Sequence, residues 1–217
     1  MKTMSPAQVL SVNCGKIRQV PVRGGTVTTS IFKSPVTGRV AVRRHNLECD
    51  RQADLTVHGG PYKAVYLYPA EHYPFWQEQL PGMDLPFGMF GENLTTTGLT
   101  EESVHIGDRF RIGSTILQVT QPRMPCYKLN FRFDRADMVK RFWRSGRSGI
   151  YFSIVSEGDL GAGDLIEPIE AGPGQVSVAD VLRLYTGDET DPELLRKALN
   201  APLYGGWKEG LAKRISP

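Results

Sequence analysis

The sequence contains few cysteines and lacks a long apolar run. Its 217 residues include three cysteines, at positions 14, 49 and 126. An odd number at such wide spacing fits neither a disulfide framework nor a Cys-x-x-Cys zinc pattern, so at least one thiol is expected to be free. No segment approaches the roughly 18 apolar residues of a membrane span, and the start of the chain lacks the apolar stretch of a secretory signal. We therefore expect a cytoplasmic protein without a membrane partner.

The sequence also lacks a strong excess of charge of either sign. Its 26 basic and 23 acidic residues give a formal net charge of +3, which is too small to indicate a nucleic-acid or membrane partner. One segment is nevertheless basic, because it holds eight basic residues and only Asp134 and Asp137 as acidic ones. The eight are Arg123, Lys128, Arg132, Arg135, Lys140, Arg141, Arg144 and Arg147. This segment begins beside Cys126.

Glycine, proline or asparagine often interrupts the sequence before residue 120. Short runs of β-type residues recur there between Gly, Pro and Asn, and several alternate apolar with polar residues, as in 109–112 and 115–120. This pattern predicts many short strands and favours a β-barrel or sandwich over a βαβ sheet. Two helical interludes are expected, one in 69–82 and one in 134–146, the latter capped by Asp134 and ended by Gly146.

The composition changes after residue 170. Residues 171–175 are rich in Gly and Pro, as a linker is, and three short helices are expected after them, within 177–187, 191–200 and 202–215. Ser177 and Asp191 are the expected caps, with Pro192 in the first helical position. We therefore predict two parts, a β domain over residues 1–170 and a helical segment over residues 175–217.

Three stretches carry candidate chemistry, and each also has a plain structural interpretation. Cys126, in "QPRMPCYKLN", lies near Arg123 and Lys128, whose charge favours the thiolate needed by a nucleophile or metal ligand. A lone cysteine is, however, more often an inert core residue. His58, Gly59, Gly60 and Lys63, in "HGGPYK", offer amides and cations to an anion such as phosphate, or form an ordinary hairpin turn. Asn93, in "FGENLTTTGL", lies in a polar loop or a capped turn.

Together these stretches resemble the motif set of MOSC-domain proteins, in particular the YiiM family of bacteria. The resemblance rests on "DLTVHGGPYKAVYLYP", "FGENLTTTGL" and "QPRMPCYKLN", in that order, and includes the paired strands "GDRFRIG" and "ILQV" before the cysteine. It implies a mainly β fold, a MOSC-type β-barrel with a few helices, followed by a C-terminal three-helix segment. It also implies the molybdenum cofactor (Mo-molybdopterin), and pyridoxal phosphate binding is a further property of such domains.

The resemblance assigns a role to each motif. Cys126 matches the cysteine whose thiolate ligates molybdenum, and a soft sulfur ligand suits that metal. Asn93 matches a loop near the metal and pterin. The candidates for the pterin and its phosphate are Arg51, His58, Gly59, Gly60, Lys63, Arg123 and Lys128. The implied activity is reduction of N-hydroxylated compounds such as 6-N-hydroxylaminopurine.

Two rival functions remain, and the oligomeric state stays open, with a homodimer among the options. A non-enzymatic carrier of the cofactor would need the same residues. A β-barrel that binds nucleic acid is disfavoured, because the basic segment lacks a dense array of aromatic residues for stacking.

A reductase must be supplied with electrons. The chain has no Gly-x-Gly-x-x-Gly after a strand and too few cysteines for an iron–sulfur cluster. We therefore expect a separate flavoprotein reductase as the partner. The basic residues expected to dock it are Lys128, Arg132, Arg135 and Arg147.

Overall fold

A computed structural model describes residues 6–22, 25–53, 59–187 and 191–213. Its strands are β1 (Gln8–Cys14), β2 (Arg18–Val22), β3 (Gly25–Thr29), β4 (Ser34–Pro35), β5 (Val40–Arg43), β6 (Asn46–Leu47), β7 (Val65–Pro69), β8 (Leu94–Thr97), β9 (Arg109–Ile112), β10 (Thr115–Pro122), β11 (Ile150–Ser156), β12 (Gly158–Leu160) and β13 (Ile166–Glu170). Its helices are the 3₁₀ helices η1 (Pro61–Lys63) and η2 (Ala70–His72), and α1 (Tyr73–Gln79), α2 (Lys128–Arg132), α3 (Met138–Ser145), α4 (Val178–Thr186), α5 (Pro192–Asn200) and α6 (Gly205–Ala212).

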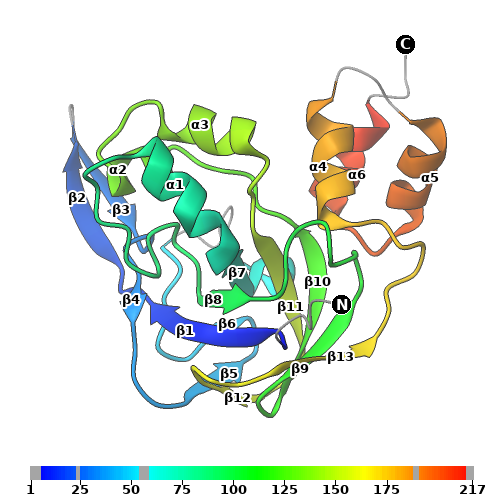
Figure 1. The fold of residues 1–217 in the computed structure, drawn as a ribbon, viewed down its shortest axis with the longest axis horizontal. Coiled ribbons are helices and arrows are strands. Elements are labelled where there is room, and N and C mark those ends of the chain that lie inside the picture. Colours follow the sequence, from blue (N-terminus) through cyan, green and yellow to red (C-terminus); the bar gives the residue numbers. More distant parts are fainter. Residues whose placement is uncertain (1–5, 23–24, 54–58, 188–190, 214–217) are drawn as a thin grey trace.

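Eight of the strands form one mixed sheet. Their order is β13-β9-β10-β11-β7-β8-β1-β4, and β7 and β8 are the parallel pair among antiparallel neighbours. Two smaller sheets join β12-β5-β6 and β2-β3. Figure 1 shows α1, α2 and α3 gathered at one side of the large sheet and α4, α5 and α6 as a separate group beside it. The expected mainly β architecture is confirmed.

The large sheet is open in the part of the chain that the structure describes, so the predicted closed barrel is not confirmed. Its edge strands are β13 and β4. One isolated bridge, between Gln8 and Leu165, and a hydrogen bond from Ile166 N to Ala7 O (2.8 Å) bring β1 next to the start of β13. The sheet therefore curls without a continuous ladder between these two strands.

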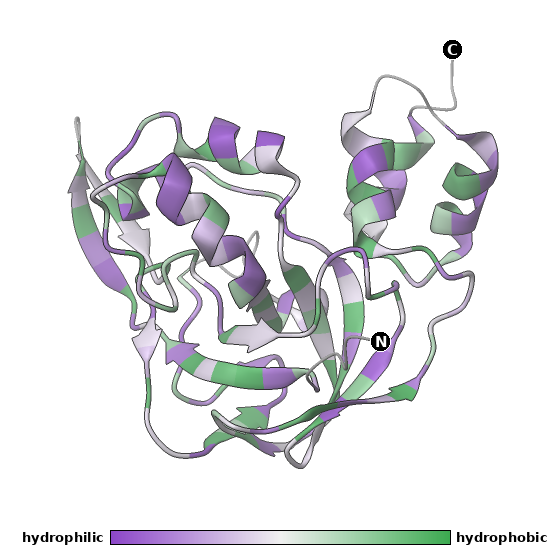
Figure 2. Ribbon diagram, viewed as in Figure 1, coloured by the Kyte–Doolittle hydropathy of each residue, from purple (hydrophilic) through white to green (hydrophobic). Residues whose placement is uncertain are grey.

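The alternation of apolar and polar residues in the sequence predicted which side chains of β9 and β10 are buried. In β9 the side chains of Phe110 and Ile112 are buried. In β10 Leu117 and Val119 are buried while Ile116 and Gln118 are partly exposed, and the alternation ends at Thr120, which is also buried. The four buried apolar residues belong to the main core. Figure 2 shows the resulting change between hydrophobic and hydrophilic residues along the strands. Period-two patterning thus identified the buried face of both strands.

A second core lies under the helices and is mainly aromatic. Tyr68 stacks on Phe90, with ring centroids 4.3 Å apart, and Trp76 lies nearly parallel to Phe142 at 6.0 Å. Both α1 and α3 bury their apolar residues here, which explains why the aromatic segment 69–82 forms a helix despite its prolines. Pro74 lies in the first turn of α1, where its missing N–H costs no hydrogen bond.

The predicted cap of the helix in 134–146 is wrong. Asp134 has a left-handed backbone (φ 47°), and α3 begins at Met138 after Asp137. The Asp137 carboxylate instead accepts hydrogen bonds from Arg135 (3.1 Å) and Arg141 (2.6 Å). Gly146 does end the helix in the left-handed conformation (φ 67°), as predicted. The short helix α2, directly after Cys126, was not predicted.

The three C-terminal helices are confirmed, with both of their predicted caps. The Ser177 hydroxyl accepts from Asp180 N (3.0 Å) in a full capping box, and the Asp191 carboxylate accepts from Leu194 N (3.0 Å). Val178, Val181 and other apolar residues of these helices are buried in the same core as the sheet. The division into residues 1–170 and 175–217 remains a prediction.

A disulfide joins Cys14 and Cys49, which the sequence interpretation had left as unpaired cysteines. Their Cα atoms lie 5.7 Å apart, and the two residues are separated by 35 positions. The prediction was wrong because the curled sheet brings together segments whose spacing in sequence carries no signal. Cys126 is the free cysteine, as expected.

None of the helices that the structure describes is long and apolar enough to cross a membrane.

Replacing Cys14 with serine is expected to lower the free energy of unfolding, because the unfolded chain regains the entropy that the disulfide removes. The chain-entropy relation gives about 4 kcal/mol for a separation of 35 residues. Urea unfolding without reductant measures the difference, and wild-type protein unfolded with reductant should lose the same amount. An unchanged wild-type midpoint in reductant would contradict this expectation.

Candidate functional site

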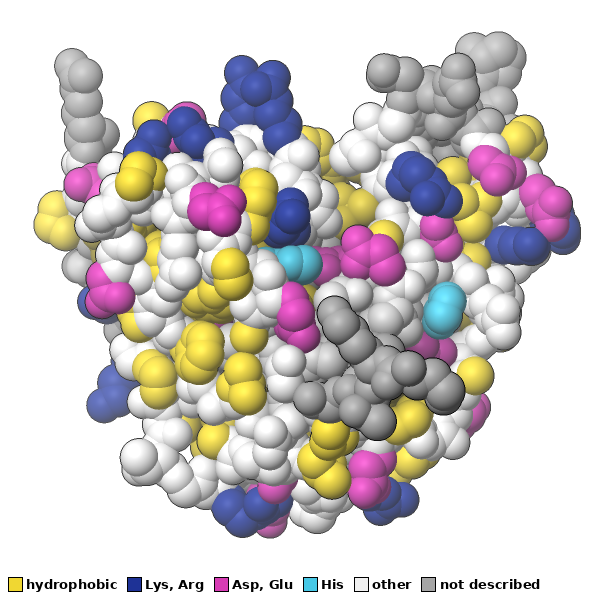
Figure 3. All heavy atoms as spheres, viewed as in Figure 1, with side chains coloured by type: hydrophobic (Ala, Val, Ile, Leu, Met, Phe, Trp, Pro, Cys, Tyr) yellow, Lys and Arg dark blue, Asp and Glu magenta, His cyan; other side chains and the backbone are white. Residues whose placement is uncertain are grey.

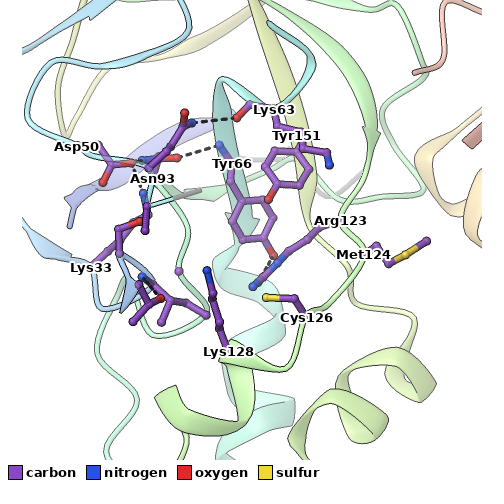
Figure 4. A pocket seen from close by; sticks show the side chains of 16 residues that line it. Lys33, Asp50, Lys63, Tyr66, Asn93, Arg123, Met124, Cys126, Lys128 and Tyr151 are labelled. Carbon is purple, nitrogen blue, oxygen red and sulfur yellow. Dashed lines mark hydrogen bonds and ion pairs between the residues drawn. The ribbon is translucent and has the colours of Figure 1, made fainter. Parts of the chain in front are cut away.

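An open cavity lies where the end of β10, the start of α2 and the loops before β4 and β8 meet. The empty space within it, which includes solvent at its open mouth, is about 660 Å³. Figure 4 shows the side chains that line it: Thr29, Ser30, Ile31, Lys33, Asp50, Gln52, Ala53, Lys63, Tyr66, Gly91, Asn93, Arg123, Met124, Cys126, Lys128 and Tyr151. Four of these side chains are cationic and one is a carboxylate. The cavity is therefore suited to an anionic ligand.

Cys126 lies in the turn between β10 and α2. The strand ends at Pro122, and the Cys126 carbonyl accepts the hydrogen bond from Leu129 N (2.9 Å) that starts the helix. The thiol is free and half-buried. Figure 4 shows it pointing into the cavity beside Arg123 and Lys128. The core interpretation of this cysteine therefore does not hold.

Arg123 is held mainly by the protein itself. Its guanidinium is buried, donates to Phe90 O (2.5 Å) and lies 3.3 Å from the Tyr66 hydroxyl. It also lies over the rings of Tyr66 (4.7 Å) and Phe142 (5.4 Å). These contacts make Arg123 a structural link between β7, α3 and the loop before β8. Its positive charge still faces the cavity.

Lys128 is the cavity cation with the fewest internal contacts. The residue is only 8% exposed, and its ammonium forms no hydrogen bond or ion pair with any residue that the structure describes. Figure 4 shows its side chain extending into the cavity next to Cys126. The ammonium is not among the buried unpaired polar atoms of the described residues, so it remains accessible from the open cavity. A cation that faces the cavity and pairs with no described residue is well placed to bind an anion.

Lys33 and Asp50 form a buried ion pair in the cavity wall, which the sequence interpretation missed. Asp50 is 1% exposed, and its carboxylate also accepts from Asn93 Nδ2 (2.9 Å) and Gly15 N (2.7 Å). Burial lowers the pKa of Lys33, whereas the adjacent Asp50 raises it. The pair thus supports the wall, and Lys33 contributes less unbalanced charge than Lys128 does.

Asn93 lies in the cavity wall, as the motif predicted, and its amide is fully engaged. Its Oδ1 accepts from Tyr66 N (3.1 Å), while its Nδ2 donates to Asp50. The backbone groups of Asn93 pair with Tyr66 O and Asn13 N, each at 2.7 Å. Asn93 therefore fixes the spacing between β7, β8 and the Asp50 segment. This role explains an asparagine at the start of β8.

Neighbouring Glu92 is buried and turned away from the cavity. Its carboxylate accepts from Gly88 N (2.7 Å), Phe90 N (3.0 Å) and the hydroxyls of Tyr73 (2.5 Å) and Thr95 (2.8 Å). Burial raises the pKa of this carboxyl group. The four hydrogen bonds stabilise the loop that carries Phe90 and Gly91 to the cavity wall. The "FGENL" motif thus serves the site mainly by shaping this loop.

Lys63 ends the 3₁₀ helix η1 and lines the cavity from the side opposite Lys33. Burial lowers the pKa of its ammonium group. Gly60 begins η1 with a left-handed backbone (φ 81°), and its carbonyl accepts from Lys63 N (3.2 Å). The glycine therefore sets the direction of the turn that presents Lys63. Gly59 and Gly60 do not line the cavity themselves.

Two predicted residues remain, Arg51 and His58. Arg51 is exposed, donates to Glu48 O and Asp50 O (both 2.8 Å) and does not line the cavity. His58 lies outside the described residues. The assignment of both to the cofactor remains a prediction.

Several cavity residues carried no signal in the sequence. Lys33, Asp50, Tyr66 and Tyr151 each stand in an ordinary loop or strand, far apart in the chain. Burial raises the pKa of both tyrosines, so both hydroxyls stay protonated near neutral pH. Only the fold brings these residues together. From the sequence, only Lys63, Asn93 and the motif around Cys126 indicated this cavity.

The side chains in the cavity limit which kind of metal centre it could hold. The described residues include no group of three His, Cys, Asp or Glu side chains that could hold a metal ion. One free thiol among several cations does not make a protein-only metal centre, which needs three or four protein ligands. It does suit a soft metal that arrives with its other ligands on an anionic organic group. The residues therefore fit a molybdenum–pterin cofactor with Cys126 as the protein ligand.

Comparison with known proteins gives the family. The MOSC domain model matches residues 54–167, which is more than half of the chain. YflK of Bacillus subtilis is 42% identical over 95% of this chain and 93% of its own length. The protein YiiM of Escherichia coli is 35% identical over 94% of this chain and 91% of its own. A Gibberella moniliformis protein named "Reductase" is 35% identical over 93% of this chain, which spans 36% of that longer protein.

A solved structure agrees with the sequence relatives. The crystal structure of YiiM from Geobacillus stearothermophilus superimposes with a TM-score of 0.81 at 34% identity, and the match covers 97% of this chain and all of that one. The MOSC match, the full-length relatives and the shared fold lead to one conclusion. The chain belongs to the MOSC-domain proteins of the YiiM family.

Proposed function

We propose that the protein is a molybdenum-cofactor-dependent reductase of N-hydroxylated compounds such as 6-N-hydroxylaminopurine. The observation that carries the proposal is the free thiol of Cys126 pointing into a cavity beside the ammonium of Lys128, which pairs with no residue that the structure describes. A thiolate supplies a soft metal ligand, and the ammonium supplies a charge for the anionic part of the cofactor. Membership of a family that includes a relative named "Reductase" supports the same class of activity.

When bound, the cofactor would supply the two-electron chemistry that cleaves the N–O bond. The protein's own residues have simpler tasks. Cys126 holds the metal, while Lys128 and Lys63 bind anionic groups. Two electrons and two protons convert the N–OH group to an amine and water. The protonated hydroxyl of Tyr151 lines the cavity and can donate a hydrogen bond to the substrate oxygen.

Electrons are proposed to come from a separate flavoprotein. More than half of the fungal "Reductase" lies outside the region shared with this chain, which is the arrangement expected if a fused domain supplies electrons there. Lys128 faces the cavity, so we remove it from the residues proposed to dock the flavoprotein. Arg132, Arg135 and Arg147 remain the proposed docking residues. Figure 3 shows basic side chains along the edge over α2 and α3.

The alternative function is a carrier that holds the cofactor without turnover. It would use the same cavity, so geometry does not separate the two functions. Turnover of an N-hydroxylated substrate by the loaded protein separates them. The phosphate of pyridoxal phosphate would suit the same cations, and we keep it as a second ligand to test.

Replacing Cys126 with alanine is expected to abolish reduction of 6-N-hydroxylaminopurine, because the protein's metal ligand is lost. The fold should persist, since only a small half-buried side chain is shortened. Activity per bound molybdenum and a circular-dichroism melt measure the two effects. Retained activity with full molybdenum content would show that the thiol is not a ligand.

Replacing Lys128 with glutamine is expected to weaken cofactor binding by about tenfold to a hundredfold, because one charge-assisted contact of ~1.5–3 kcal/mol is removed. Lys140 to glutamine is the matched control, since Lys140 is an exposed lysine on α3. Molybdenum content after reconstitution at limiting cofactor is the measurement. Equal losses in both variants would place the anionic group elsewhere.

The loaded protein is expected not to reduce its substrate with NADH or NADPH alone, because nothing in the sequence binds a nicotinamide or flavin. Adding a flavoprotein reductase should start turnover, and its rate should fall as salt screens the encounter. Stopped-flow or steady-state assays over a salt series provide the measurement. Sustained turnover with NADH alone would refute the need for a partner.

A further inference from the structure

One side chain of the C-terminal segment reaches the wall of the cavity. Tyr204, which precedes α6, lies with its ring 5.4 Å from the Lys63 ammonium. Its ring also contacts that of Tyr62, with centroids 5.3 Å apart. Lys63 and Tyr62 both belong to η1, about 140 positions earlier in the chain. The C-terminal segment and η1 are therefore in contact through the Tyr204 ring, which lies near the Tyr62 ring and the Lys63 ammonium.

The loop that carries Lys63 contacts both β10 and the C-terminal segment. On one side the Tyr62 carbonyl accepts a hydrogen bond from the hydroxyl of Thr120 on β10 (2.7 Å). On the other side its two side chains meet Tyr204. With three residues, η1 has too few internal hydrogen bonds to hold a long lysine side chain in one direction. Its neighbours must therefore provide the direction.

Tyr204 is itself well supported. Its carbonyl accepts hydrogen bonds from Trp207 N (2.9 Å) and Lys208 N (3.2 Å), which start α6. The helix is anchored in the main core by Trp207 and Leu211. Gly206 leaves space for the ring, because a Cβ at that position would lie 3.0 Å from Tyr204 Cε1. The backbone of Tyr204 is thus fixed relative to the sheet, while the residue is 37% exposed.

We propose that Tyr204 is a positioning residue that holds the Lys63 side chain at the edge of the cavity, so that the C-terminal segment contributes to the anion site. An aromatic face attracts an ammonium within about 6 Å of the ring centre, and the attraction grows when the cation is partly buried. Lys63 is such a cation. The role of the site as a cofactor site rests on the proposed function, but the positioning of Lys63 does not.

The test measures binding of inorganic phosphate to the purified, cofactor-free protein by calorimetry, so it does not depend on reductase activity. Tyr204→Ala should weaken phosphate binding about threefold to tenfold, whereas Tyr204→Phe, which keeps the ring face, should remain within about twofold of wild type. Lys63→Met should weaken it as well. In the double variant Tyr204→Ala/Lys63→Met the two effects should not add, because the ring acts through the lysine.

Three outcomes would overturn the proposal. Unchanged affinity in Tyr204→Ala with a lowered melting temperature would assign Tyr204 a structural role only. Equal losses in Tyr204→Phe and Tyr204→Ala would assign the effect to the hydroxyl. Additive losses in the double variant would show that Tyr204 acts without Lys63. Failure of the reductase assay alone would count against the proposed function and leave the Tyr204–Lys63 coupling standing.

Discussion

The cavity depends on one buried carboxylate, that of Asp50. It accepts from the Lys33 ammonium, the Asn93 amide and the Gly15 backbone, and so joins three segments that are far apart in sequence. Removing one partner of a buried ion pair leaves an uncompensated charge and is strongly destabilising. The disulfide between Cys14 and Cys49 lies beside two of these residues and fixes the same junction covalently. The cavity wall is therefore built before any ligand binds.

This wall divides the cavity cations into two kinds. Arg123 and Lys33 are satisfied by carbonyl, aromatic and carboxylate groups of the protein. Lys128 has no such partner among the described residues, and Lys63 lies over a tyrosine ring. Arg123 and Lys33 therefore shape the site, while Lys128 offers its charge to a ligand. Cys126 lies among the cavity cations. One cavity therefore offers both a sulfur ligand for a metal and positive charge for an anion.

The sequence predicted local features well and long-range contacts poorly. Period-two runs identified the strands, and the caps at Ser177 and Asp191 identified two C-terminal helices, because these signals lie within a few residues of each other. The Asp134 cap failed because Asp134 lies in a turn after α2, in which Arg135 N donates to Asn130 O (2.9 Å), and the Asn130 side chain accepts from Val139 N (2.9 Å) at the start of α3. The site was located through Cys126, whereas Asp50 was missed, because no spacing rule indicates that the curled sheet brings it to residues 15, 33 and 93.

The central claim is that the Cys126 thiolate ligates molybdenum in this cavity. X-ray absorption at the molybdenum edge tests it most directly, since the method counts sulfur neighbours of the metal without requiring turnover. Wild-type protein and the Cys126→Ala variant, both loaded with the cofactor, form the comparison. The account predicts one sulfur neighbour fewer in the variant. An unchanged sulfur count in a fully loaded variant would contradict it.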